Sequence, residues 1–467
     1  MRMRALLTVA LFLLLPASAQ AADLYVNAST PGCSDAVAAA VAQSAATPWC
    51  SPAPAAQLAQ PGDIVHIASG TYAQQLRPVT SGTEAQPIIY QGEGAVTLAA
   101  PTGSVGVMLV GVHDIKLREL SIQANGPQGI WLQDASRILI GRSTVTNHGG
   151  VGIQIKSGSD NTVAQCNLAD NAKAGLLDMD DAQGTTLSGS IVTGNGHDGQ
   201  KYDGDGVELN SSGALVTGNR IQGNGDSVGF EHGIYAGSAA RGYTIVGNSI
   251  EDNAGADVKA AGGPALVTGN RLRTSLFGVV VSDNPAVVTV QYNLIQGRFE
   301  HGILVTTGRH SAARARFWNN TVEQTGRLTG TGNASAVFVV SAGLLALRNN
   351  LLAYTNPDGL GQAVMIDSRA LVGSFTASNN WYADTDPAKR RLAWNGSLVT
   401  LGQWRRLSGQ DATSIASPAP RFGPGGRVVS HNAGVARGLR LGLARDLAGT
   451  RIKSGSRPDI GAFQHRS

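Results

Sequence analysis

Aromatic residues make up only 5% of this 467-residue chain, charged residues 15%, and cysteine occurs three times. Beyond its first residues the chain has no apolar run long enough to cross a membrane, so no transmembrane segment is predicted. Glycine, in contrast, occurs 60 times, together with many asparagines and short β-branched residues. This composition is typical of a long solenoid, which grows by adding coils and does not need several separate cores.

Residues 1–21 have the features of a secretory signal peptide. Arg2 and Arg4 precede an apolar run over residues 5–16, and Ala19 and Ala21 supply the small residues of a cleavage site. The mature chain is therefore expected to start at Ala22 and to be secreted or periplasmic. Export argues against nucleic acid as a partner, and we expect a monomer.

An Asn-x-apolar pattern recurs through the second half of the chain, and its apolar position continues backwards to residue 122 without the asparagine. The spacing is 22 to 30 residues, which is typical of a stacked solenoid. Short alternating strands lie between the repeats, with no helical stretches, so the chain is predicted to be an all-β parallel β-helix of about a dozen coils. The asparagines should stack at one turn of each coil. They are Asn219, Asn248, Asn270, Asn293, Asn320, Asn350 and Asn380.

The chain divides into an N-terminal cap over 22–62, the β-helix over 63–388 and a basic closing segment over 389–467. Cys33 and Cys50 bracket residues 34–41, which are predicted to form a short helix over the open end of the first coil. A disulfide between these cysteines would stabilise the cap by on the order of 3 kcal/mol. Cys166 takes the place of a ladder asparagine and is predicted to be a free thiol.

Charge is distributed unevenly along the chain. Residues 389–467 hold 14 Lys and Arg against three acids, whereas residues 22–388 hold 20 basic and 29 acidic residues. We favour an interpretation in which the basic segment packs back on the acidic coils by charge complementarity. The alternative is an electrostatic landing surface for an acidic polymer.

Two ends of the chain resemble a known family. Residues 61–72 (PGDIVHIASGTY) and 87–92 (PIIYQG) look like the opening of secreted right-handed parallel β-helix proteins of the pectate-lyase-like type. Residues 378–382 (SNNWY), 409–415 (GQDATSI) and 457–463 (RPDIGAF) are similar to phrases near the closing end of such chains. The resemblance implies a right-handed β-helix over nearly the whole mature chain and a polysaccharide-directed protein, since many members are polysaccharide lyases or epimerases.

Two adjacent coils are enlarged by about seven residues each, at 194–206 and 223–233. Functional residues prefer loops on a rigid scaffold, so the site is predicted here. Aligning strands on their leading glycines, including Gly233 and Gly255, turns Glu208, Tyr235, Asp257 and Lys259 outward. In the preceding coil, a one-residue slip that keeps Leu177 and Met179 inside would turn Asp178 and Asp180 outward.

Stacked carboxylates repel one another unless a cation lies among them, and oxygen-rich sites of this kind suit Ca²⁺. A calcium site is therefore predicted at these coils. Its expected ligands are Asp178, Asp180, Asp203, Asp205 and Glu208.

The function predicted first is cleavage of an acidic, uronate-containing polysaccharide by β-elimination. Lys259 would remove the C5 proton, with Tyr235 or His232 as the acid or second base. The strand Asp257-Val-Lys259 is similar to the acid-x-Lys strand of β-helix lyases with a lysine base beside calcium. Their partner arginine one coil later is replaced here by residues 280–282 (VVS). Substrate contacts are predicted for Lys201, Tyr202, Glu231 and Asp257.

Three other functions stay open. A glycoside hydrolase could use Asp180, Asp181, Asp203 and Asp205, although the polygalacturonase motifs are absent. The Asp-Pro-His-Asp turn of alginate epimerases is also absent. The main alternative is a non-catalytic polysaccharide-binding or exopolysaccharide-assembly factor, which the missing arginine favours.

Overall fold

The computed structural model describes residues 21–123, 126–202, 204–274, 276–282, 286–307, 312–326, 334–355, 361–366, 371–384, 392–429 and 433–464. The predicted signal peptide lies outside these residues, apart from Ala21. Within these ranges no helix is long and apolar enough to cross a membrane.

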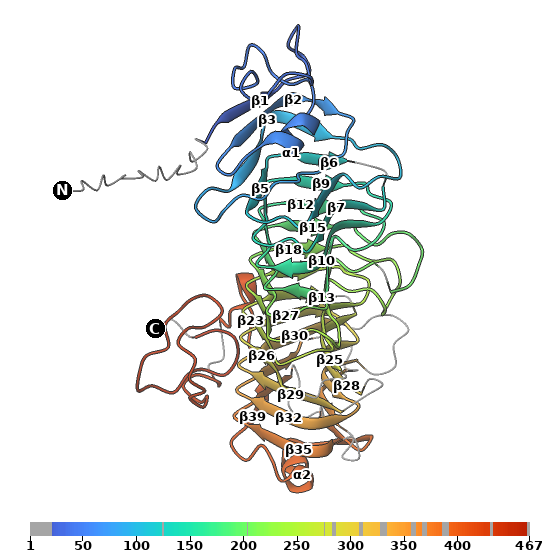
Figure 1. Ribbon diagram of the computed structural model, residues 1–467. Coiled ribbons are helices and arrows are strands. Elements are labelled where there is room, and N and C mark those ends of the chain that lie inside the picture. Colours follow the sequence, from blue (N-terminus) through green and yellow to red (C-terminus); the bar gives the residue numbers. More distant parts are fainter. Residues whose placement is uncertain are drawn as a thin grey trace, which may run out of the picture.

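The chain winds into an elongated stack of about 11 turns, and successive turns pair through parallel strands (Figure 1). The strands form three rows that run along the stack. Row 1 carries the enlarged coils and ends in one antiparallel pair, β37–β38. Its strands are β4 (Val107–Val110), β7 (Gln128–Gln133), β10 (Val151–Ser159), β13 (Leu176–Gln183), β16 (Val207–Leu209), β19 (Ile234–Ala236), β22 (Ala256–Ala260), β25 (Phe277–Ser282), β28 (His301–Thr306), β31 (Ala334–Val339), β34 (Gly361–Ile366), β37 (Leu392–Trp394) and β38 (Ser397–Val399).

Row 2 begins at the cap. Its strands are β1 (Asp23–Val26), β2 (Ile64–Tyr72), β3 (Ile88–Leu98), β5 (Ile115–Arg118), β8 (Leu139–Gly141), β11 (Thr162–Ala164), β14 (Thr186–Ser188), β17 (Leu215–Thr217), β20 (Tyr243–Val246), β23 (Ala265–Thr268), β26 (Val288–Gln291), β29 (Ala313–Trp318), β32 (Ala342–Arg348) and β35 (Leu371–Ser378).

Row 3 follows row 2 in each coil, and the long strand β3 pairs with both rows. Its strands are β6 (Ser121–Gln123), β9 (Thr144–Thr146), β12 (Asn167–Ala169), β15 (Ile191–Thr193), β18 (Arg220–Gln222), β21 (Ser249–Glu251), β24 (Arg271–Thr274), β27 (Leu294–Arg298), β30 (Thr321–Gly326), β33 (Leu351–Tyr354), β36 (Trp381–Asp384) and β39 (Ile415–Pro418). The described helices are α1 (Ala53–Leu58), α2 (Leu401–Ser408) and a 3-10 turn, η2 (Pro424–Gly426).

The core consists of small and medium aliphatic side chains that repeat at the same place in each coil. In row 1 the inward column runs through Leu176, Val207, Ile234, Val258 and Val279, all fully buried. Each coil buries its apolar side chains only against the coils above and below it. This explains why the core needs few aromatic residues.

The predicted asparagine ladder is present at the turn between rows 2 and 3. From Asn219 to Asn380, each side-chain amide donates a hydrogen bond to the Oδ1 of the next asparagine at 3.0–3.1 Å. The same oxygen also accepts the backbone N–H of the preceding asparagine. Cys166 occupies an earlier position of this turn as a buried free thiol, and burial raises its pKa to about 11.

The rows continue beyond residue 388, where the sequence pattern placed the end of the β-helix. Strand β37 pairs with β34, and β39 pairs with β36. Asp411 extends the ladder, because its Oδ1 accepts the side-chain amide of Asn380 at 3.1 Å. An aspartate thus takes the place of the asparagine that the sequence pattern requires.

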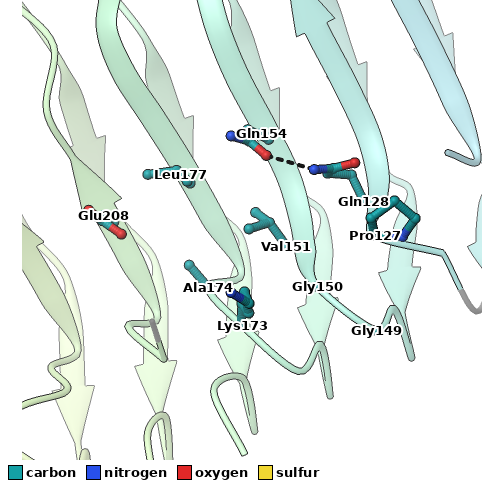
Figure 2. A pocket seen from close by; sticks show the side chains of 10 residues that line it. All are labelled: Pro127, Gln128, Gly149, Gly150, Val151, Gln154, Lys173, Ala174, Leu177 and Glu208. Carbon is teal, nitrogen blue, oxygen red and sulfur yellow. Dashed lines mark hydrogen bonds between the residues drawn. The ribbon is translucent and has the colours of Figure 1, made fainter. Parts of the chain in front are cut away.

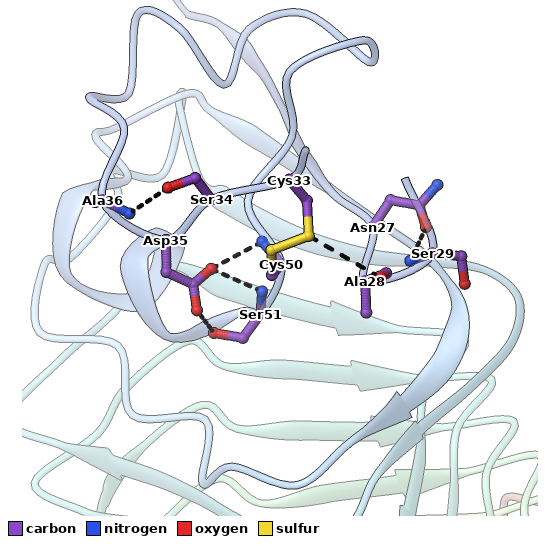
Figure 3. Close-up of a disulfide and its surroundings, with 9 residues drawn as sticks. All are labelled: Asn27, Ala28, Ser29, Cys33, Ser34, Asp35, Ala36, Cys50 and Ser51. Atoms are coloured by element: carbon purple, nitrogen blue, oxygen red, sulfur yellow. Dashed lines mark hydrogen bonds between the residues drawn. A yellow bond between two sulfur atoms is a disulfide. The ribbon is translucent and has the colours of Figure 1, made fainter. Parts of the chain in front are cut away.

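The cap contains the Cys33–Cys50 disulfide, with a Cα–Cα distance of 5.0 Å (Figure 3). Residues 34–47 form successive turns instead of the predicted helix. The side chain of Asp35 accepts hydrogen bonds from the backbone N–H groups of Cys50 and Ser51 at 2.8 and 2.9 Å. These bonds tie the start of the segment to its end, which favours a closed loop over a helix.

Residues 419–429 and 433–464, here called the docked segment, pack against row 3 on the side of the stack away from β25 and β28 (Figure 1). Three corner asparagines with left-handed backbone, Asn319, Asn349 and Asn379, donate side-chain hydrogen bonds to carbonyl groups of this segment. Ile460 packs with Trp381 and Leu351 of row 3. The segment is thus held by backbone hydrogen bonds and apolar contacts.

Candidate functional site

The outward column of row 1 gathers unlike side chains on neighbouring strands. The register places Leu177, Glu208, Tyr235, Lys259 and Val280 opposite one another in that order. Neighbouring strands lie about 4.8 Å apart, so Glu208, Tyr235 and Lys259 form one continuous cluster. The ammonium of Lys259 lies 5.2 Å from the ring centroid of Tyr235. Each of the three side chains is partly exposed.

The register differs from the one expected for Asp257. Strand β22 pairs Lys259 with Tyr235, so Asp257 lies in the column of Gly233. The predicted alignment placed Gly255 in that column, two residues earlier in the chain. The Asp257 carboxyl is therefore directed into the corner of the coil, where it is 1% exposed and accepts a hydrogen bond from Asn253 at 3.3 Å. Burial raises the pKa of Asp257 well above its usual range. The prediction that Asp257 binds substrate is wrong on this placement.

Asp178 also points inward, because the predicted one-residue slip in β13 does not occur. Leu177 lies in the outward column and Met179 is exposed. Asp178 lies in the inward column opposite Leu209, fully buried, and accepts hydrogen bonds from the backbone and hydroxyl of Ser211 and from the backbone of Asn210. It holds the turn after β16 and is not placed to bind a surface cation.

Asp205 and His232 are buried next to the exposed cluster, 2% exposed each. Asp205 accepts the backbone N–H of His232 at 2.6 Å, and His232 Nδ1 accepts the backbone N–H of Ala256 at 2.9 Å. Burial, with a smaller contribution from Lys259, lowers the pKa of His232 to about 3. Burial and the charge of Glu208 raise the pKa of Asp205. His232 is therefore neutral and not accessible, which contradicts its predicted role as an acid or base.

Glu231 holds the second enlarged loop. It is fully buried, and its Oε2 accepts the backbone N–H groups of Asp226 and Ser227 at 2.8 Å each. These bonds close a tight turn within the loop. The substrate-binding role predicted for Glu231 is therefore wrong, because the side chain does not reach the surface.

The two enlarged loops meet through an aromatic contact. The rings of Tyr202 and Phe230 lie edge to face with centroids 5.1 Å apart, and the ammonium of Lys201 lies 4.9 Å from the Phe230 centroid. Tyr202 is 65% exposed and Phe230 40% exposed. The sequence pattern predicts contacts for Lys201 and Tyr202 but not for Phe230. An aromatic residue in the neighbouring enlarged loop was the signal that could have indicated it.

A groove extends from Glu208 toward earlier coils on the outer face of row 1 (Figure 2). Gln154 accepts a hydrogen bond from Gln128 at 3.0 Å, and Leu177 and Lys173 line the groove between them and Glu208. On the same two strands, β10 and β7, the ammonium of Lys156 lies 5.9 Å from the ring centroid of Trp131. The groove thus presents amides, several apolar side chains and Lys173 along a line of parallel strands.

The predicted calcium site is not supported by the described residues. Of the three expected ligands whose side chains the structure describes, Asp178 and Asp205 are buried and hydrogen-bonded, and Glu208 faces outward. Across the ranges that the structure describes, no three His, Cys, Asp or Glu side chains group so that they could hold a metal ion. Asp203 and the side chain of Asp180 lie outside the described residues, so the calcium prediction depends on them.

A second asparagine ladder lies inside the corner between row 3 and the loops that lead to row 1. Asn171, Asn195, Asn224 and Asn253 are linked by side-chain hydrogen bonds of 2.9–3.0 Å. The Asn-x-apolar spacing does not predict this second ladder, because the enlarged loops separate these asparagines from the next strands. This ladder fixes the base of both enlarged loops.

A family model described as the right-handed β-helix region matches residues 97–202 and 200–325. The chain is a right-handed parallel β-helix protein. This β-helix protein is similar to XylC in complex with xylose, with 10% identity, coverage of 95% of this chain and 98% of that chain, and a TM-score of 0.53.

The β-helix protein is also similar to the PL6 family alginate lyase AlyGC, with 13% identity, coverage of 88% and 57%, and a TM-score of 0.52. For the pectate lyase Pel9A the identity is 13%, the coverage 96% and 98%, and the TM-score 0.44. No match was found among curated proteins. At identities this low, the two TM-scores above 0.5 show a shared fold alone and leave activity to the residues of the site.

Proposed function

We propose that this β-helix protein is an exported, carbohydrate-active lyase that cleaves a uronate-containing polysaccharide by β-elimination. The observation that carries the proposal is the register of Glu208, Tyr235 and Lys259 on adjacent strands of one outer face. A groove leads to this cluster over several coils, which suits an extended polymer better than a small molecule.

The charges around the groove favour an anionic polymer. Lys173 lines the groove, Lys201 lies on the first enlarged loop, and Lys156 is exposed on β10, a strand that borders the groove. The exposed rings of Tyr202 and Phe230 offer apolar faces on which sugar rings can stack. A fold shared with an alginate lyase and with a xylose-bound protein is consistent with this class of ligand.

In the proposed mechanism, neutral Lys259 accepts the proton from C5 of the uronate. The released electron pair forms the C4–C5 double bond as the bond from C4 to the glycosidic oxygen breaks. Tyr235 gives its phenolic proton to the departing oxygen. A groove lysine balances the substrate carboxylate. No step is assigned to calcium, because the described carboxylates do not form a site for it.

The test is to follow the ultraviolet absorbance of the unsaturated uronate product. Purified protein is mixed with alginate, pectate, glycosaminoglycans or bacterial exopolysaccharides, with added Ca²⁺ and then with chelator. Absorbance should rise on at least one polymer. In Lys259→Ala the rate of this rise should be lower by about 100-fold or more. Lys116→Ala, a lysine substitution on row 2 strand β5, is the matched control and should retain activity.

The second candidate function is binding without cleavage. It is favoured by residues 280–282, which provide no arginine one coil after Lys259. The same screen separates the two functions. No absorbance change and no new reducing ends on any polymer, together with saturable binding to one of them, would overturn the lyase proposal. An effect of chelator on the rate would return Asp180 and Asp203 to consideration as calcium ligands.

A further inference from the structure

The docked segment carries a dense set of exposed cations. Between residues 437 and 457 it has six of them, and all are exposed. The coil rows, by comparison, intersperse acids with bases, for example in the Arg220–Glu251 and Arg142–Glu119 ion pairs. The six cations are Arg437, Arg440, Arg445, Arg451, Lys453 and Arg457.

The acids of this segment face inward. Asp446 accepts the backbone N–H groups of Ala448, Thr450 and Gln464, and Asp459 accepts that of Ala436. Both carboxylates are less than a tenth exposed. The acids therefore organise the fold of the segment, and its outer surface is left with positive charge.

The surface is fixed in place by its attachment to the coils. Leu439 and Asn349 exchange two hydrogen bonds, from the Leu439 N–H at 2.7 Å and to the Leu439 carbonyl at 2.8 Å. Ala462 donates to the hydroxyl of Thr321 on β30 at 2.9 Å. A cationic surface held in one geometry binds a polyanion at a lower cost in conformational entropy than a free tail.

A pocket lies where this surface meets the coils. Arg440, Lys453 and the hydroxyl residues Ser454 and Ser456 line it from the docked segment, and Tyr292 and Asn319 line it from the coils. Two cations beside hydroxyl and amide groups are suited to a carboxylate or sulfate that is flanked by sugar hydroxyls.

We propose that the docked segment is a second binding surface for an anionic polysaccharide, separate from the groove on row 1. The identity of the ligand rests on the proposed function, whereas the surface itself rests on the exposed cations. Row 3, which carries the segment, and row 1 face different sides of the stack (Figure 1). The surface would hold one part of a long chain near the protein while another part occupies the groove, which raises the local concentration of substrate.

The experiment compares two triple variants with equal loss of charge. Arg451→Gln/Lys453→Gln/Arg457→Gln removes three exposed cations from the docked segment. Arg77→Gln/Lys116→Gln/Arg118→Gln removes three cations from the early coils, of which Arg77 is exposed and Lys116 and Arg118 are half-buried, and is the control. Binding is measured on immobilised polygalacturonate, alginate and heparin at low and high salt, with neutral dextran and duplex DNA as further probes.

The docked-segment variant should bind the anionic polysaccharides about tenfold more weakly at low salt, and the control within about twofold of wild type. Equal losses in both variants, or a loss that appears only with DNA, would overturn the proposal. Unchanged thermal unfolding of both variants verifies that the segment stays docked. Because binding is read without cleavage, the result stands apart from the lyase assay: a protein that cleaves nothing can still show the difference.

Discussion

In rows 1 and 3 the outward column changes polarity part-way along the stack. Row 3 changes from polar to apolar side chains, and row 1 changes from apolar to polar ones. In row 3 the column is mostly polar in early coils, with Ser121, Thr144 and Ser249, and becomes apolar at Leu294, Leu351 and Trp381. The docked segment covers these apolar side chains and leaves each of them at most 3% exposed. The change in row 3 is thus explained by a partner within the chain.

In row 1 the column is mostly apolar, with Met108, Trp131 and Leu177, and it becomes polar at Glu208, Tyr235 and Lys259. These three side chains stay partly exposed, Glu208 lines a groove, and the two enlarged loops lead into the strands of Glu208 and Tyr235. Where the outward column changes and the chain itself covers the changed side chains, the change serves packing. Where the changed side chains face a groove, a ligand should be sought. This difference predicts that changes in row 3 alter stability and that changes in row 1 alter activity.

The largest effect is expected for Trp381→Ala, which removes the largest side chain beneath the docked segment. The substitution should destabilise the protein by about 3–5 kcal/mol, because it leaves a cavity and deprives Ser417 of a hydrogen bond. Denaturant unfolding and limited proteolysis of the docked segment measure it. Ile191→Ala is the matched control from the same column, where the side chain is 47% exposed, and its effect should stay within about 0.5 kcal/mol.

The second effect is expected for Tyr235→Phe, which removes only a hydroxyl group from row 1. On the polymer found by the screen, kcat should fall about 100-fold with little change in unfolding free energy. Combined with Lys259→Ala it should cost little more than either single change, because the two groups act in one step. Additive losses, or a Tyr235→Phe variant with full activity, would remove Tyr235 from the mechanism.

A smaller effect is expected for Phe230→Ala on the second enlarged loop. Loss of the ring that contacts Tyr202 and Lys201 should raise KM about fivefold to tenfold with kcat nearly unchanged, since stacking contributes to binding in both ground and transition states. Val228→Ala is the control on the same loop, because Val228 is 69% exposed. Equal effects of the two substitutions would argue for a general disturbance of the loop.

The sequence was sufficient for the parts of the fold that every coil repeats. The Asn-x-apolar spacing identified the ladder from Asn219 to Asn380, because each asparagine satisfies the same backbone group in its coil. Alternation along the strands also turned Glu208, Tyr235 and Lys259 outward. The pattern requires asparagine and therefore did not identify Asp411 as the next member of the ladder. An aspartate can take this place because its carboxylate accepts the same hydrogen bond as the asparagine side chain.

The rest of the site depended on register and burial, which the sequence did not determine. In β13 unbroken alternation places Asp178 inside, paired with Ile155, and Met179 outside, and the pairing with β10 shifts only after that pair. A one-residue error in register moves every following side chain to the other face. The burial of Asp205, Glu231 and His232 depends on how the enlarged loops fold back, and a strand pattern carries no information about that.

The smallest effect on stability is expected for His66, a titratable outward side chain whose hydrogen-bond partners lie within the chain. His66 joins β1 to β3 through Nε2 to Asp23 at 2.9 Å and Nδ1 to Glu93 at 2.6 Å. Burial alone would lower the pKa of His66, but the hydrogen bonds to Asp23 and Glu93 raise it above the usual 6.5. The stabilisation is therefore fully present below the unfolded-state pKa and is lost as pH rises through the folded-state pKa.

Melting temperatures between about pH 5 and about pH 9 measure this dependence. The wild-type protein should lose slightly more stability across that range than His66→Gln, whose side chain does not titrate. The difference should be small because both carboxylates are more than half exposed and water screens them. Identical profiles would show that the bridge contributes nothing. The comparison of rows 1 and 3 predicts that a side chain with partners within the chain affects stability alone. A change in polymer cleavage by His66→Gln at constant stability would contradict this prediction.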